Sequence, residues 1–233
     1  MGEDLIIIIQ WLAHAAFKIK TDDKIIYIDP RYMKKFKAQI GSYFKNPEKA
    51  DIILFTHHHA DHCYPSSFAN MRSSTCKYLG PEKCKEKVGS RLTIIEAGDE
   101  MEVDGVKIRV VDAYNIKRRR SSGSLWHPKG IGVGFLITLA GLTIYHSGDT
   151  ESIPEMKEFG HIDLALLPIG DKFTMSIEES INVAKIINPK FVIPMHNHES
   201  KPSEFKKKLE AISNICVIAL EMGEIYDLTK IKK

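Results

Sequence analysis

The chain has 233 residues, and its 33 lysines and arginines nearly balance its 30 aspartates and glutamates, giving a formal net charge of +3. This balance argues against a domain that binds polyanions through bulk charge. The length suits a single layered α/β domain over residues 1–233. The four cysteines show no CxxC spacing, and the sequence has no signal peptide and no membrane-length apolar run, so we expect a reduced, cytoplasmic protein without a membrane partner.

Apolar runs along the chain predict strands at residues 5–9, 24–28, 51–55, 106–111, 131–139, 141–145, 162–168, 190–194 and 215–220. Helices are expected between them. The clearest runs from Ser176 to Ile187, where Ser176 and Glu179 form a capping-box pattern, and a second covers residues 203–213. Strand clusters in both halves, each followed by helices, predict two sheets packed face to face with helices outside.

The segment Thr56-His57-His58-His59-Ala60-Asp61-His62 follows the third predicted strand. His57 and His59, two residues apart, can turn both imidazoles toward one point. Asp61 and His62 face a second point nearby, so one loop can serve two metals. Imidazole and carboxylate suit Zn, Fe, Ni or Mn, and the absence of paired thiolates argues against a closed structural zinc site. The cluster therefore predicts an open, catalytic metal site.

Two later predicted strands end in residues of the same kind. The run at 141–145 leads through His146 into Gly148 and Asp149, where the glycine permits a tight turn that presents the carboxylate. The run at 190–194 ends in Met195 and delivers His196. The pattern of a strand followed by a metal-binding residue thus recurs along the chain.

These motifs, HxHxDH at 57–62, Gly-Asp-Thr at 148–150 and Met-His at 195–196, resemble the metallo-β-lactamase superfamily over nearly the whole chain. The resemblance implies a four-layer αββα sandwich, with two mixed β-sheets and helices on the outer faces.

Three further segments resemble one branch, the L-ascorbate-6-phosphate lactonase-like hydrolases and their prokaryotic relatives. These segments are Trp11–Phe17, Ile25–Pro30 and Tyr145–Thr150.

The resemblance also implies a ligand set and a reaction. His57 and His59 would bind the first metal, Asp61, His62 and His196 the second, and Asp149 would bridge them. The implied cofactors are two divalent ions, zinc foremost, with Mn, Fe and Ni as alternatives. Two such ions lower the pKa of water, so the implied reaction is attack of a metal-activated hydroxide on a small ester, lactone or phosphodiester. Asp61 would be the catalytic residue that orients the hydroxide and moves its proton.

The sequence departs from the superfamily pattern at one ligand. The third histidine of the first site usually follows the strand that corresponds to residues 106–113, but here Tyr114 and Asn115 follow it. Asn115 offers only a weak amide oxygen. Either the first site is incomplete or another histidine replaces the ligand, and we favour His127, with His198 as the alternative. Asn115 as a turn former and His127 as a loop residue over the cavity are the simpler interpretations.

Candidate substrate contacts lie near these residues. His14 follows the first predicted strand and is equally compatible with a hydrogen bond to a ligand, a substrate contact or a structural role. Tyr114 flanks a basic loop in which Arg118 and Arg119 can grip a phosphate or carboxylate, or form a solvated surface. We therefore expect a small, anionic substrate.

Two other functions compete with this one. A nuclease or phosphodiesterase acting on nucleic acid fits the basic loop, since the superfamily contains RNA-processing members, but the chain lacks the interleaved aromatic residues expected for binding single strands. A non-catalytic binding protein that kept the fold fits the lost ligand at position 115. The number of chains in the assembly is left open, with a homo-oligomer among the options.

Overall fold

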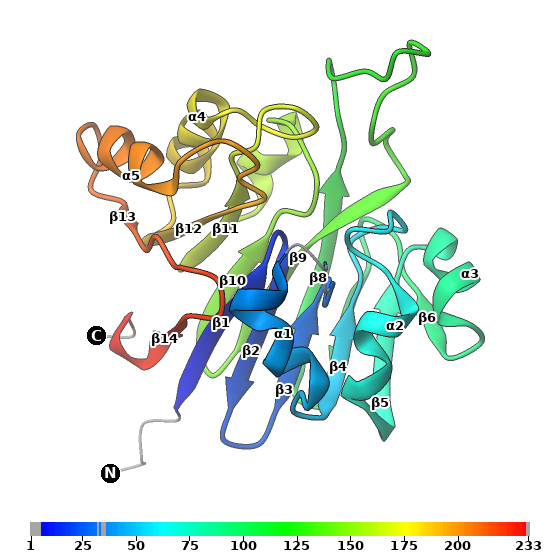
Figure 1. The fold of residues 1–233 in the computed structure, drawn as a ribbon. Coiled ribbons are helices and arrows are strands. Elements are labelled where there is room, and N and C mark those ends of the chain that lie inside the picture. The colour runs from blue at the N-terminus through cyan, green and yellow to red at the C-terminus, as the bar shows by residue number, and fades with distance from the viewer. Residues whose placement is uncertain (1–5, 32, 34–35, 232–233) are drawn as a thin grey trace. The chain divides into compact units, whose positions relative to one another are not determined.

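The computed structural model describes residues 6–31, 33 and 36–231, which form two compact units, each built on one seven-stranded mixed sheet (Figure 1). Unit 1 comprises residues up to 95 together with those from 220 onward, and unit 2 comprises residues 96–219. The predicted α/β class with two mixed sheets and helices is confirmed. The single domain over residues 1–233 stays a prediction.

The sheet of unit 1 is antiparallel from β14 to β3 and parallel from β3 to β6. Its strands, in spatial order, are β14 (Ile225–Asp227), β1 (Ile7–Ala13), β2 (Ala16–Thr21), β3 (Ile25–Ile28), β4 (Ala50–Leu54), β5 (Arg72–Gly80) and β6 (Leu92–Ile94). The helices are α1 (Lys37–Lys45), α2 (Pro65–Phe68) and α3 (Lys85–Val88). Ile40 and Phe44 of α1 and Phe68 of α2 share one core cluster with side chains of this sheet.

The sheet of unit 2 repeats this arrangement, because β7 to β10 are antiparallel and β10 to β13 are parallel. Its strands, in spatial order, are β13 (Cys216–Val217), β12 (Phe191–Met195), β11 (Leu164–Pro168), β10 (Leu142–His146), β9 (Gly132–Leu139), β8 (Val106–Ala113) and β7 (Glu100–Val103). Two helices, α4 (Ile177–Ile187) and α5 (Pro202–Glu210), lie beside β11 to β13 (Figure 1) and bury Ile181, Phe205 and Leu209 in its core.

Strand direction brings the predicted site residues of each unit to one edge of its sheet. In unit 1, β3 and β4 run parallel, so the residues that follow them, Asp29 and the segment 56–62, lie at the same edge. In unit 2, β10 and β12 both run parallel to β11, so Asp149 and His196 also follow strand ends at one edge. Such carboxyl ends are where ligand sites of α/β sheets form.

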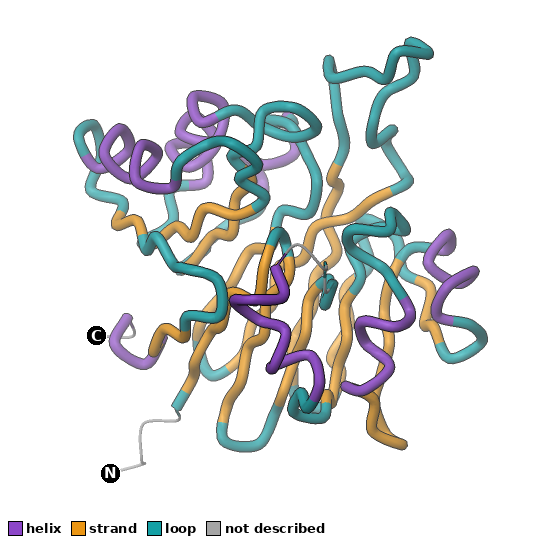
Figure 2. The backbone as a smooth tube through the Cα atoms, in the orientation of Figure 1, coloured by secondary structure: helices purple, strands orange, loops and turns teal. Residues whose placement is uncertain are grey.

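The segment between β8 and β9 is loop throughout (Figure 2), apart from one bridge between Arg119 and Leu125 near its tip. Within the described part of the chain, none of the helices has the length and apolar composition needed to cross a membrane.

The predicted elements are found with shifted ends. The first strand covers residues 7–13 rather than 5–9, and residue 5 lies outside the described residues. The run at 215–220 forms a strand only at Cys216–Val217, and the helix expected over 203–213 covers Pro202–Glu210. The capping box of Ser176 and Glu179 is confirmed. The predictions missed the helices α1 and α3 and the strands β2, β5, β6, β7 and β14.

Candidate metal-binding residues

The loop after β4 gathers the predicted histidines of unit 1. The ring centroids of His57 and His59 lie 4.7 Å apart, and those of His57 and His62 lie 4.0 Å apart. The backbone N–H of His62 donates to the carbonyl of His59, which closes the loop into a turn. His57 and His62 are buried. The structure therefore brings these three side chains together, with His62 nearer to His57 than His59 is, whereas the spacing assigned His62 to a second point nearby.

A buried carboxylate that the sequence analysis did not assign fixes two of these rings. Asp29, fully buried, lies 2.6 Å from Nδ1 of His62 and accepts hydrogen bonds from the Thr56 backbone N–H and hydroxyl. Because the Thr56 hydroxyl donates to Asp29, it can accept from Nδ1 of His57, 3.0 Å away. Both imidazoles then carry the proton on Nδ1 and the lone pair on Nε2. A carboxylate on the far nitrogen is the usual support for a metal-binding histidine.

Asp61, the predicted catalytic residue, is half exposed and pairs with His14. Its Oδ2 lies 3.3 Å from Nε2 of His14, and its side chain is 45% exposed. The His14 ring also packs edge-on against His62, with centroids 5.4 Å apart. His14 therefore contacts both a predicted ligand and the predicted catalytic carboxylate, while its role stays a prediction.

In unit 2, the turn after β10 presents Asp149. Gly148 has φ of +61°, a conformation that glycine adopts without strain, and its N–H donates to Nδ1 of His146 at the strand end. The Asp149 side chain is buried. His146 thus shapes the turn that carries the carboxylate.

Two predicted histidine ligands converge on the same oxygen of Asp149. Oδ2 of Asp149 lies 3.4 Å from Nε2 of His127 and 3.2 Å from Nε2 of His196. The backbone around His196 requires Gly170, because a Cβ there would lie 2.2 Å from the His196 carbonyl oxygen. All three side chains are at least 95% buried. The alternative His198 contacts His196 instead, with ring centroids 5.0 Å apart.

Asn115 is hydrogen-bonded to the favoured replacement ligand. Its Oδ1 lies 2.8 Å from both the backbone nitrogen and Nδ1 of His127. Asn115 and His127 also pair through the Asn115 N–H and the His127 carbonyl. Asn115 is therefore not an isolated turn former but a partner of His127.

The predicted substrate contacts of the β8–β9 loop are already engaged with protein groups. Arg118 pairs with the carboxylates of Glu151, Asp171 and Glu179. Paired hydrogen bonds to these acids raise the pKa of Arg118, although burial opposes the rise. The Tyr114 hydroxyl donates to Glu155.

Arg119 is exposed and donates to the Gly123 carbonyl. The substrate roles of Tyr114, Arg118 and Arg119 stay predictions.

Sequence reasoning missed Asp29, Thr56 and Glu151 as supporting residues. A usable signal for Asp29 is its place directly after a buried apolar strand and before Pro30, since a carboxylate there lies at the same sheet edge as the histidine loop. Thr56 directly precedes the loop. Glu151 gave no signal of its own, because its partners are backbone N–H groups 33–35 residues away.

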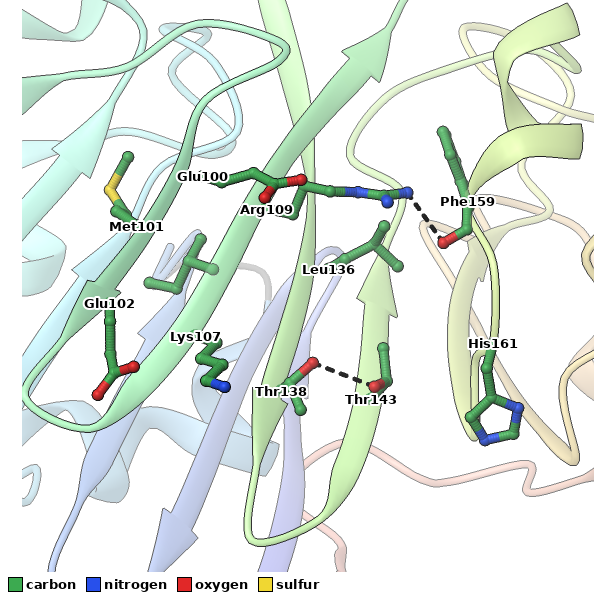
Figure 3. A pocket seen from close by; sticks show the side chains of 11 residues that line it. Glu100, Met101, Glu102, Lys107, Arg109, Leu136, Thr138, Thr143, Phe159 and His161 are labelled. Atoms are coloured by element: carbon green, nitrogen blue, oxygen red, sulfur yellow. Dashed lines mark hydrogen bonds between the residues drawn. The ribbon is translucent and has the colours of Figure 1, made fainter.

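A shallow pocket of about 460 Å³ lies on the β7–β10 face of unit 2, and Figure 3 shows its lining. The Arg109 guanidinium donates to the Phe159 carbonyl there, and Thr138 contacts Thr143 (Figure 3). Among the described residues that line this pocket, none is a predicted ligand or catalytic residue. The pocket is therefore separate from the candidate metal-binding residues.

The donor sets fit divalent transition metals. Unit 1 offers imidazoles supported at Nδ1 by Asp29 and Thr56, and unit 2 offers two imidazoles facing one carboxylate oxygen. Imidazole and carboxylate donors suit zinc, iron and manganese, whereas calcium and magnesium prefer oxygen alone. The three described buried cysteines are free thiols and lie outside these donor sets.

Comparisons with known proteins agree with this chemistry. A family model described as a beta-lactamase superfamily domain matches residues 8–196. A UPF0173 metal-dependent hydrolase from Methanosarcina mazei is 32% identical, over 94% of this chain and 98% of its own length. Another from Thermococcus onnurineus is 35% identical, over 94% and 99%.

Solved structures show the same fold. A protein from Parabacteroides distasonis aligns with a TM-score of 0.80 and 31% identity, covering 91% of each chain. Igni18, described as a novel metallo hydrolase from Ignicoccus hospitalis, aligns with a TM-score of 0.77 and 27% identity, over 95% of this chain and 98% of its own. The narrower resemblance to lactonase-like hydrolases stays a prediction.

Proposed function

We propose that this chain, which belongs to the beta-lactamase superfamily and to its UPF0173 metal-dependent hydrolases, binds two divalent metal ions and hydrolyses a small anionic substrate. Family membership makes the chain a metal-dependent hydrolase. The proposed parts are the number of ions, zinc as their identity, and an ester, lactone or phosphodiester as the substrate.

The observation that carries the proposal is the support of the imidazoles at Nδ1 in both units. His62 is held by Asp29, His57 faces the Thr56 hydroxyl, and His127 faces the Asn115 amide oxygen. Each partner places the proton on Nδ1, so Nε2 is the nitrogen able to bind a metal. Histidines that serve only the core need no such common orientation. The proposed ligands are His57, His59, Asp61 and His62 of unit 1 and His127, Asp149 and His196 of unit 2.

Divalent ions at these donors would lower the pKa of water toward neutrality and polarise the scissile carbonyl or phosphoryl group. The protein's own contribution is proton handling at Asp61. Its half-exposed carboxylate can exchange protons with solvent, and His14 at 3.3 Å restricts its orientation. We assign to Oδ2 of Asp61 the acceptance of the proton from the attacking water and its delivery to the leaving group.

An anionic substrate is supported by Arg31, which follows Asp29 and Pro30 in unit 1. Its guanidinium stacks 4.2 Å over the Tyr64 ring and donates to Ser67. Burial lowers the pKa of Arg31, and the charges of Tyr64 and Asp61 oppose that shift. A partly buried guanidinium beside the catalytic carboxylate suits recognition of a phosphate or carboxylate group.

The test is metal content per chain by elemental analysis of protein purified without chelator or added metal. We expect about two metals in the wild type and a clear loss in His62→Ala and in His127→Ala. His161→Ala is the matched control, since His161 is exposed and pairs only with Asp163 in the described contacts. A wild type that holds no metal would refute the proposal and favour a non-catalytic binding protein.

Substrate class is tested separately with the metal-loaded enzyme on nitrophenyl esters, lactones and nitrophenyl phosphodiesters. We expect hydrolysis of at least one class and its loss in Asp61→Asn. The nucleic-acid alternative is weakened because Arg118 of the basic loop is paired with three carboxylates. Cleavage of RNA but of none of the small substrates would restore it.

A further inference from the structure

Asn115 lies where the superfamily pattern expects a metal-binding histidine, and every polar atom of its side chain is engaged. Its Nδ2 donates to the Phe173 carbonyl at 2.9 Å and to the Glu151 carboxylate at 3.3 Å. Its Oδ1 meets the backbone nitrogen and Nδ1 of His127, each at 2.8 Å. The residue is 1% exposed. A buried amide with four contacts is a fixed part of the structure, not a vestige of a lost ligand.

These contacts determine which way the amide points. The Phe173 carbonyl and the Glu151 carboxylate accept hydrogen bonds, so the group facing them must be the NH2 group. The His127 backbone N–H can only donate, so the atom facing it must be Oδ1. Nδ1 of His127, which faces the same oxygen, must therefore carry a proton. In the neutral form of the ring, Nε2 would then hold the lone pair, and this nitrogen lies 3.4 Å from Oδ2 of Asp149.

Glu151 holds Asn115 in this orientation. Its carboxylate, 2% exposed, accepts the backbone N–H groups of residues 116, 117 and 118 as well as Nδ2 of Asn115. The Arg118 guanidinium also pairs with this carboxylate, at 3.1 Å. Arg118, in turn, ties Glu151 to the 171–179 segment through Asp171 and Glu179.

We infer that Asn115, clamped by Glu151, is a positioning residue that holds His127 in the Nδ1–H form and directs Nε2 toward Asp149. Position 115, where the superfamily pattern expects a histidine, therefore has a role in the candidate site as the support of His127. The contribution of His127 to metal binding rests on the proposed function. The proton on Nδ1 does not, because the contacts of Asn115 require it.

The first test measures the tautomer in metal-free protein by long-range ¹H–¹⁵N correlation of histidine-labelled samples above the titration range of imidazole. His127→Gln identifies the His127 signals. We expect the Nδ1–H form in the wild type, and an Nε2–H form there would overturn the inference whether or not any variant folds.

Two substitutions of Asn115 separate positioning from general stability. Asn115→Leu removes the acceptor, so the ring should turn to the Nε2–H form and donate to Asp149, the acceptor 3.4 Å away. Asn115→Asp also disturbs the contact with Glu151 but keeps an oxygen facing Nδ1, so the Nδ1–H form should persist. Retention of the Nδ1–H form in Asn115→Leu would overturn the inference.

Glu151→Gln tests the clamp. The amide nitrogen it introduces would face N–H donors, so Asn115 should loosen and the Nδ1–H share of His127 should fall. Glu155→Gln is the matched control, because Glu155 is a nearby carboxylate that pairs with Tyr114 and Lys129. If the two variants show the same Nδ1–H share of His127, Glu151 does not hold Asn115 in its orientation.

Zinc affinity, measured by competition with a chromophoric chelator, separates this inference from the proposed function. We expect Asn115→Leu to bind zinc about 10–100-fold more weakly than the wild type, and Asn115→Asp to bind it at least as tightly as the wild type. If the tautomer switches as expected while zinc affinity does not change, the positioning role stands and His127 is removed from the proposed ligands.

Discussion

Asp29 in unit 1 and Asn115 in unit 2 both orient a histidine ring, one through a carboxylate and the other through an amide. Each accepts the Nδ1 proton of a buried histidine, His62 in one case and His127 in the other. A carboxylate makes the imidazole a stronger donor than a neutral amide does, because the negative charge stabilises the ring as it gives up electron density. We therefore expect the ligands of unit 1 to contribute more to metal affinity than His127 does.

Asp29→Asn tests the support of His62. The new NH2 group would face the Thr56 N–H or the His62 ring, so one buried hydrogen bond is lost. We expect the free energy of unfolding to fall by about 1–3 kcal/mol and zinc affinity to fall about 10–100-fold. Denaturant titration and chelator competition measure the two effects.

Asp51→Asn is the control for this substitution. Asp51 accepts one backbone N–H, from Ile25, at the start of the neighbouring strand. In Asp51→Asn the free energy of unfolding should fall by at most about 1 kcal/mol, and the zinc affinity should not change. Equal zinc affinities in the two variants would contradict the role of Asp29.

At the scale of elements, the continuously apolar strands were predicted, while the missed strands carry polar side chains or lie at a sheet edge. The buried strands β4, β9, β10, β11 and β12 were all expected, within one or two residues. The missed β2 alternates Lys18 and Lys20 with buried apolar residues, and both lysines pair with Glu48. The missed β14 pairs only with β1, from the opposite end of the chain.

The candidate site shows the same division. His57, His59, Asp61, His62, Asp149 and His196 follow from motifs, because metal ligands must be particular residue types at strand ends. The residues that orient these candidate ligands cannot be predicted from motifs. Glu151 is recognised only once the loop of residues 116–118 folds back onto it, since no spacing rule links a carboxylate to backbone N–H groups.

The first turn of α4 carries a pH-dependent contribution to stability. Glu179 completes the capping box and pairs with Arg118 at 2.5 Å and with Lys117. Burial acts to raise its pKa, but Arg118 and Lys117 lower it further, to about 2, below the ordinary value of 4.5. Because the folded state prefers the ionised form, this stabilisation is present above pH 4.5 and is lost as pH falls toward about 2.

Glu179→Gln keeps the capping pattern and removes the charge. We expect the free energy of unfolding at neutral pH to fall by about 1–2 kcal/mol, a figure reduced for solvent screening, and its decline in acid to become shallower. Denaturant titrations between neutral pH and pH 3 measure both. In Glu178→Gln, which removes an exposed pair with Lys208, the loss should stay below about 0.5 kcal/mol. Equal losses in the two variants would contradict the assignment.

At the scale of the whole molecule, the proposed donors are spread from His57 to His196, over most of the chain. A chain that is unfolded cannot hold such distant residues together, so metal binding should favour the folded state of both units. The sheet edges that carry the donors are built by parallel strand pairs, which need long connections and form late. Metal binding would therefore stabilise the sheet edges, which are formed by segments that lie far apart in the sequence.

Zinc should raise the melting temperature of the metal-free protein. At a free zinc concentration of about 100 times the dissociation constant, linkage adds about 2.7 kcal/mol, which for a chain of this size corresponds to roughly 5–10 °C. Differential scanning calorimetry with and without zinc measures the shift. His62→Ala in unit 1 and His196→Ala in unit 2 should each reduce it, while His161→Ala, at an exposed position, should keep it. A shift that survives in His196→Ala and vanishes only in His62→Ala would show that unit 1 alone binds the metal.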